Sequence, residues 1–285
     1  LVGRNAVVEI SNALDGKVRV PVSQAGGVWY VNGDDLYGLS DEESTITIPV
    51  KSDYDYTVDM PVWITGEKVK EGYNFTLAEN TTGNARKGTV IFKSQKGTKE
   101  ITFVQFGVND IAGTYEATYS TFGEGDDWVS ETVKIELLQD EEDETVFYAN
   151  GLSSIRGVVL PLKFDSETYQ LSALNGQYLG FIESQKWYLY TIVRSEAGYV
   201  HADTSLSYPA IAELDVDDEE LMPFFPFKDK KGLSFTGETG TIKSFIDAIG
   251  VYVFASKSPT FGNNNNLGYY DIFKDLSIKK IKADN

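Results

Sequence analysis

Two stretches of this chain share one pattern: Arg4-Asn-Ala-Val-Val-Glu-Ile-Ser with Val18-Arg-Val-Pro-Val-Ser-Gln24-Ala-Gly26, and Arg86-Lys-Gly-Thr-Val-Ile-Phe-Lys with Ile101-Thr-Phe-Val-Gln105-Phe-Gly107. In both stretches apolar and polar residues alternate on each side of a turn, which is typical of a β-hairpin with one buried face. Gln24 and Gln105 are 81 positions apart. A repeat of this length is too long for a solenoid and fits tandem small β-domains.

The composition supports an all-β protein and disfavours several functions. The 285 residues are 41% hydrophobic, and short apolar runs alternate with Gly, Asn, Asp and Ser, as expected for many short strands. A formal net charge of −18 disfavours binding to nucleic acid and to anionic membranes, because proteins that bind these surfaces carry a surplus of Lys and Arg. With no cysteine, disulfides, thiolate metal sites and cysteine nucleophiles are excluded. No stretch has the pattern of a signal peptide or a membrane-spanning helix.

The repeat divides the chain into three regions. Residues 1–26 are expected to be the last hairpin of a truncated upstream repeat, and residues 27–107 hold one complete copy with six or seven short strands, an immunoglobulin-like β-sandwich pattern. Because the sequence starts partway into the repeated signature, we expect a missing N-terminal part with a signal and a lipid-anchor cysteine. The alternative is that residues 1–26 are completed by the following segment as one larger domain.

The complete copy resembles a BACON domain. The resemblance rests on seven positions of the family's pattern. They are an aromatic residue (Tyr56), a Trp (Trp63), an Asn (Asn80), an Arg-x-Gly strand (Arg86 and Gly88) and a closing Gln-x-Gly (Gln105 and Gly107). It covers about residues 40–107, with a partial second match at 1–26. This family occurs in Bacteroidetes, often at the N-terminus of surface and carbohydrate-active proteins. The resemblance therefore implies a surface or periplasmic lipoprotein of the cell envelope, attached to the membrane only through the missing lipid anchor.

Residues 108–285 contain many further strand-like runs, which predict a larger antiparallel β-barrel or β-sandwich. Their opening, Gly113-Thr-Tyr, resembles the start of lipocalin-like barrels. A short helix is expected near residues 242–249.

Aromatic residues in predicted loops of this region are the candidates for ligand binding, because a flat ring stacks on the apolar face of a sugar while carboxylates and amides bind its hydroxyls. Trp128 follows the acidic loop that contains Asp126 and Asp127, and a polar loop carries Asn264 and Asn265. Three further rings are Phe224 and Phe225, which lie between Pro223 and Pro226, and Phe227, which follows Pro226. They could form a binding lip or close the end of a barrel, and the second interpretation is favoured.

Catalysis and metal binding have weaker support. His201 is the only histidine and has no nucleophile motif nearby, so a structural role is favoured over a catalytic triad. Calcium is considered at Asp215, Asp217 and Asp218, although the spacing does not match an EF-hand loop. Paired carboxylates for glycoside hydrolysis have no distinctive pattern here.

We therefore expect a non-catalytic cell-envelope protein that binds a glycan or mucin. Two alternatives remain: a structural spacer or protein-interaction module, and a lipocalin-like binder of a small apolar ligand.

Overall fold

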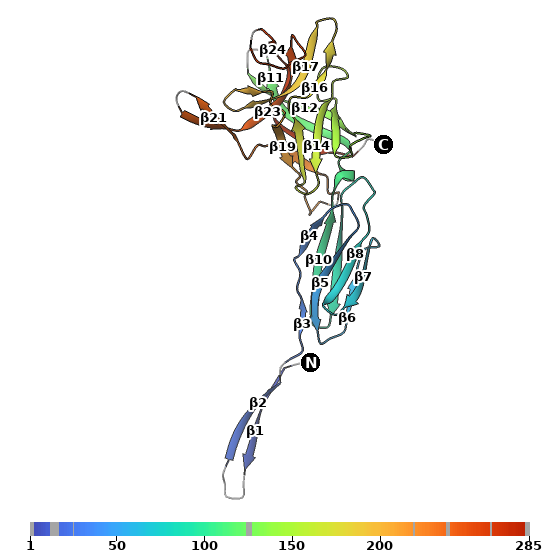
Figure 1. Cartoon of the computed structure of the whole chain (residues 1–285). Helices are drawn as coiled ribbons and strands as arrows, with labels where there is room; N and C mark the ends of the chain where they lie inside the picture. The colour runs from blue at the N-terminus through green and yellow to red at the C-terminus, as the bar shows by residue number, and fades with distance from the viewer. Residues whose placement is uncertain are drawn as a thin grey trace. The chain divides into compact units, whose positions relative to one another are not determined.

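A computed structural model of the chain describes residues 3–11, 17–24, 26–123, 127–218, 220–237, 240–262 and 264–282. Within these ranges the regular structure consists of β-strands and one short 3-10 helix, η1 (Val108–Asp110) (Figure 1). The predicted all-β fold is confirmed. The described residues contain no helix that is long and apolar enough to cross a membrane. Residue contacts divide the chain into unit 1 (Leu1–Asn80 and Arg86–Gln105) and unit 2 (Thr81–Ala85 and Phe106–Asn285).

Unit 1 begins with a hairpin of β1 (Arg4–Ser11) and β2 (Lys17–Gln24), which form a two-stranded sheet of their own. Their register pairs Arg4 with Gln24 and Val8 with Val20. One face of the hairpin is apolar and exposed, with Val8 48%, Val20 40% and Val22 48% accessible.

The rest of unit 1 is a β-sandwich of two four-stranded sheets (Figure 1). One sheet has the order β4-β10-β9-β6 and the other β3-β5-β8-β7. The strands are β3 (Trp29–Val31), β4 (Leu36–Leu39), β5 (Ser44–Ser52), β6 (Tyr56–Asp59), β7 (Ile64–Val69), β8 (Gly72–Leu77), β9 (Arg86–Ser94) and β10 (Gly97–Gln105). Strand β4 pairs with β10 in parallel. Phe75, Phe92 and Phe103 are fully buried between the sheets, as the alternating pattern predicts.

Four of the seven residues that carry the family resemblance form a connected cluster in this sandwich. Arg86 Nε donates to Gln105 Oε1 at 2.9 Å, and the guanidinium lies 4.3 Å from the ring centroid of Trp63. Gln105 is fully buried and donates to the carbonyl oxygens of Glu42 and Ala78. A Cβ at Gly88 would lie 2.7 Å from the Trp63 ring, so a larger residue would displace that ring. In this structure these residues therefore act in packing and hydrogen bonding within the sandwich.

Unit 2 is built on a curled 12-stranded sheet, with the path β16-β17-β23-β24-β11-β12-β13-β14-β15-β19 and with β18 and β20 paired to β17 and β24 (Figure 1). The strands are β11 (Gly113–Phe122), β12 (Trp128–Gln139), β13 (Val146–Asn150), β14 (Leu160–Asp165), β15 (Gln170–Leu174), β16 (Tyr178–Ile182), β17 (Trp187–Ser195), β18 (Val200–His201), β19 (Ser207–Ile211), β20 (Phe224–Pro226), β23 (Ile246–Phe254) and β24 (Asn266–Lys280). A separate hairpin consists of β21 (Leu233–Gly237) and β22 (Gly240–Ser244).

The curled sheet encloses the main core of unit 2. Its largest fully buried side chains include Tyr115, Phe147, Phe164, Phe225 and Phe273. Two isolated bridges, Ala210↔Phe227 and Glu213↔Phe224, connect the β19 edge to the β20 segment, which in turn pairs with β24. This antiparallel, barrel-like arrangement agrees with the predicted class.

The boundary between the units differs slightly from the predicted one. Phe106 is 3% exposed and packs in the core of unit 2, against Phe164 and Phe225. Lys280, whose pKa is lowered by burial, donates from Nζ to the carbonyl oxygens of Gly83 and Asp110. These contacts explain why residues 81–85 and 106–107 belong to unit 2.

The helix expected near residues 242–249 is wrong. The segment instead forms the end of β22 and the start of β23, and every residue of β23 is buried. A strand buried on both faces has a continuous apolar run, which cannot be distinguished from a buried helix by periodicity alone.

Candidate functional site

The strands of the large sheet separate their side chains onto two faces. Leu189, Val193 and Val251 belong to the main core. Tyr190, Ile192, Tyr252 and Phe254, which alternate with them along β17 and β23, form a second cluster. Because successive side chains of a strand point to opposite faces, this second cluster defines an outer face.

Six aromatic residues on consecutive strands form a row on this face. Cross-strand pairing joins Tyr178 to Tyr190, Tyr190 to Tyr252, and Tyr252 to Tyr269. Phe122 continues the row, with its ring centroid 5.2 Å from that of Tyr269 and 4.1 Å from that of Trp128. We call these six residues the aromatic row: Tyr178, Tyr190, Tyr252, Tyr269, Phe122 and Trp128. Six strands correspond to five strand spacings, or about 24 Å.

The middle of the aromatic row is buried, and residues toward both of its ends reach the surface. Tyr190 and Tyr252 are 6% and 4% exposed, and burial raises the pKa of Tyr252 to about 12. Tyr190 donates its hydroxyl to the carbonyl of Lys257 at 2.6 Å, so the loop after β23 covers the middle. Tyr178 at one end is 47% exposed, and Tyr269 and Trp128 in the other half of the row are 43% and 36% exposed.

Two cations hold the Trp128 end of the row. The Arg194 guanidinium lies 5.3 Å and the Lys274 ammonium 5.5 Å from the Trp128 ring centroid, within the range of cation–π attraction. Both cations also lie near Asp247, with Arg194 Nη1 at 2.8 Å and Lys274 Nζ at 3.9 Å. Burial raises the pKa of the Asp247 carboxyl, and the two cations oppose that shift. The indole is therefore fixed between Phe122 and a charged group, with about a third of its surface accessible.

The residues predicted beside Trp128 have different outcomes. Asp126 lies outside the described residues. Asp127 is exposed, and its carbonyl oxygen accepts a hydrogen bond from the Gly123 amide at 2.8 Å. This bond closes the connection between β11 and β12 directly before Trp128.

Two of the three phenylalanines are core residues, so the binding-lip interpretation is wrong for them, and their burial fits the favoured interpretation that they close the barrel. Phe225 and Phe227 are 0% and 4% exposed and pack in the main core. Strand alternation turns them inward, while Phe224 between prolines is half-buried. Phe224 lines a cavity of about 420 Å³ with Asp215 and Asp218.

The two asparagines also differ. Asn265 uses its amide inside its own loop, donating from Nδ2 to the carbonyl oxygens of Ser258 and Thr260 and accepting from Ser256 Oγ. Asn264 is exposed and has a φ of 62°, a conformation that Asn adopts more readily than most residues. Asn265 is therefore occupied in the loop, and Asn264 remains accessible.

The acidic residues considered for calcium form turns. Asp215 Oδ1 accepts the amide of Asp217 at 3.0 Å, and Asp218 Oδ1 accepts that of Glu220 at 3.2 Å. Across the described ranges, no group of three or more acidic or histidine side chains is arranged to hold a metal ion. Calcium binding at these residues stays a prediction.

The aromatic row was missed by the sequence analysis. The tyrosines that the row takes from β17, β23 and β24 are separated by up to 79 positions. The detectable signal is the alternation Tyr188, Tyr190 and Tyr252, Phe254 within apolar strands. Which of these rings meet depends on strand order and register, which sequence periodicity does not provide.

No protein-family model and no curated protein matches this chain. Among solved structures, a protein of unknown function from Bacteroides ovatus aligns with a TM-score of 0.30 and 8% sequence identity, over 88% of this chain and 91% of that chain. A similarity this low does not establish a shared fold.

Proposed function

We propose that this chain is a non-catalytic cell-envelope protein that binds a glycan or mucin through the outer face of unit 2. The observation that carries the proposal is the exposed end of the aromatic row, where Trp128, Phe122 and Tyr269 are in ring contact. Flat rings stack on the C–H faces of pyranoses. Arg194 and Lys274 supply hydrogen-bond donors at the same end, and the Asp247 ion pair holds Arg194 in place.

The fixed geometry favours binding of a ligand over a packing role alone. Trp128 is held by a stacked ring and two cations yet keeps 36% of its surface accessible. A preorganised ring loses little side-chain entropy when a ligand docks. The lipocalin-like alternative has less support, since bulky side chains such as Tyr115, Phe147 and Phe273 fill the interior of the curled sheet.

The BACON assignment of unit 1 and the envelope location belong to the same proposal. Their support is the cluster of Trp63, Arg86, Gly88 and Gln105, which gives the residues of the resemblance a common structural role. In this proposal the sandwich is the scaffold and unit 2 recognises the ligand. The location at the outer-membrane surface or in the periplasm follows from the resemblance alone.

A glycan array that includes mucin O-glycans and plant and host polysaccharides tests the proposal. Trp128→Ala should reduce binding to the recognised glycan at least tenfold. The matched control is Tyr30→Ala in unit 1, an aromatic residue that is 55% exposed and outside the row. Each variant is first checked for an unchanged thermal unfolding midpoint. No glycan bound by the parent protein, or equal binding by Trp128→Ala, would overturn the proposal.

A further inference from the structure

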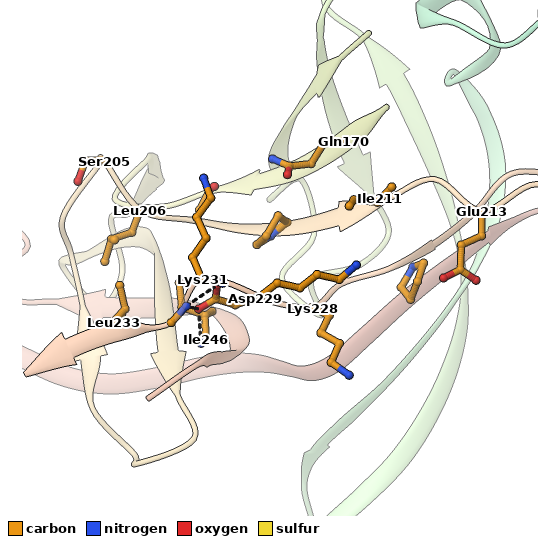
Figure 2. Close-up of a pocket in the computed structure, with 15 residues that line it drawn as sticks. Gln170, Ser205, Leu206, Ile211, Glu213, Lys228, Asp229, Lys231, Leu233 and Ile246 are labelled. Carbon is orange, nitrogen blue, oxygen red and sulfur yellow. Dashed lines mark hydrogen bonds between the residues drawn. The ribbon is translucent and has the colours of Figure 1, made fainter. Parts of the chain in front are cut away.

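A second feature of unit 2 is a cavity of about 780 Å³ that is lined by residues of β19 and by Gln170 of β15. It lies between β19 and the segment 228–233 that follows β20 (Figure 2). Figure 2 shows Ser205 and Leu206 at one end and Glu213 at the other, with Lys228, Asp229 and Lys231 between them. The volume is within the usual range for small-ligand sites, about 300–1,000 Å³.

Asp229 fixes the wall of this cavity. It is 9% exposed, and its two carboxylate oxygens accept the backbone amides of Lys231, Gly232 and Ile246 at 2.8–3.2 Å. Gly232 has a φ of 72°, and a Cβ there would lie 2.6 Å from Lys243 Cε. The turn is therefore held by hydrogen bonds and requires a glycine. It places a lysine before Asp229 and two lysines directly after it.

The charge of the cavity is opposite to that of the chain. Lys228, Lys230 and Lys231 line it and are exposed, and no ion pair joins any of them to a carboxylate of the described residues. The chain has 43 acidic and 25 basic residues, so three adjacent lysines without acidic partners stand out from the rest of its surface. Of the two lining carboxylates, Asp229 is committed to backbone amides, and Glu213 lies at the far end (Figure 2).

Six apolar residues also line the cavity, together with the polar side chains of Gln170, Ser205 and Ser207: Leu206, Pro209, Ile211, Pro226, Leu233 and Ile246. An apolar floor with cations along it suits a ligand that has both a hydrophobic ring face and negative groups. A long polyanion is disfavoured, because the −18 charge of the chain repels it beyond the local patch.

We propose that this cavity binds an acidic saccharide, a short sugar chain carrying carboxylate or sulfate groups. The lysines attract the anionic groups, and the apolar floor receives the C–H face of the ring. This inference rests on the proposed glycan function at one point only, which is the choice of a saccharide as the molecule that carries the negative groups. The cavity is a second site, distinct in its residues from the aromatic row.

Isothermal titration calorimetry on the full chain tests this with three probes: a sulfated, uronate-containing heparin disaccharide, neutral lactose and inorganic sulfate. The disaccharide should bind at least tenfold more tightly than either other probe, and its affinity should fall as salt rises from 50 to 300 mM, because ions screen exposed charges. Equal binding of inorganic sulfate would overturn the saccharide assignment. No binding of the disaccharide would overturn the site.

The lysines are tested by the triple variant Lys228→Gln, Lys230→Gln, Lys231→Gln, which should weaken disaccharide binding at least tenfold. Lys163→Gln, an exposed lysine of the same unit, is the matched control and should bind as the parent does. Unchanged affinity in a folded triple variant contradicts the inference. Trp128→Ala should leave disaccharide binding at the cavity intact, so failure of the cavity and failure of the aromatic row are separately visible.

Discussion

Arg194 places one guanidinium nitrogen, Nη1, 2.8 and 3.0 Å from the two carboxylate oxygens of Asp247. The side chains are only 19% and 7% exposed. Removing one partner of a buried pair leaves the other charge unpaired in a poorly solvated place. This pair also positions the cation beside Trp128, so it links stability of the outer face to the geometry of the candidate site.

We predict that Arg194→Met lowers the free energy of unfolding by about 2–3 kcal/mol, less than the loss for a fully buried pair, because part of the guanidinium reaches water. Urea denaturation, monitored by Trp fluorescence, measures this loss of stability. The control is Lys163→Met, whose partner Asp143 lies 3.7 Å away with both side chains about half exposed, and it should change stability by less than about 0.5 kcal/mol. Equal effects of the two substitutions would contradict the prediction.

The second prediction separates the two neighbouring phenylalanines of β20. Phe225→Ala should destabilise unit 2 by about 3–5 kcal/mol, because it removes a fully buried ring and leaves a cavity. Phe224→Ala should cost less than half as much, since Phe224 is half-buried at a cavity wall. Thermal and urea unfolding of both variants measure the difference. A larger loss for Phe224→Ala would show that the inward and outward faces of β20 are assigned the wrong way round.

The third prediction uses the repeated hairpin. Val8 and Val90 occupy equivalent positions, but Val8 is 48% exposed and Val90 fully buried. Val90→Thr should destabilise unit 1 by about 1–3 kcal/mol, because it buries a hydroxyl in an apolar core. Val8→Thr should be neutral within about 0.5 kcal/mol. A substantial loss of stability in Val8→Thr would mean that the β1–β2 face is covered in solution.

The fourth prediction concerns pH. Burial lowers the pKa of His201 below its ordinary 6.5, and the nearby charge of Asp203 partly offsets this by raising that pKa. The unfolded chain therefore binds the proton more readily than the folded chain. The stability from neutral His201 is fully present above about pH 6.5 and is lost as the pH falls toward the lower folded pKa.

His201→Gln tests this directly, because His201 is the only histidine. Between pH 7.5 and 5.5 the unfolding midpoint of the parent protein should fall more than that of His201→Gln, which retains all the carboxylates. Parallel midpoints over this range would show that His201 titrates alike in the folded and unfolded states.

The sequence predicted those features that depend on local alternation. The hairpin over residues 86–107 and the all-β class follow from period-two patterns around recognisable turns. The candidate functional residues are harder to predict from the sequence. Trp128 was identified because it follows an acidic loop, whereas Phe225 and Phe227 were also considered as surface rings although alternation about Phe224 turns them inward.

The sequence by itself determined that this chain forms β-hairpins, repeats one of them, and carries a large negative charge. Tertiary structure alone decided what each hairpin face contacts. The same apolar pattern is buried in β9–β10 by the opposite sheet and exposed in β1–β2, because burial depends on which strands pack against it. Strand order likewise brought Tyr252, Tyr269 and Trp128 into one row, and the path of the chain after β20 placed Lys228 and Lys231 along a cavity. Such contacts join residues far apart in the chain, and their pairing is set by register and packing rather than by local pattern.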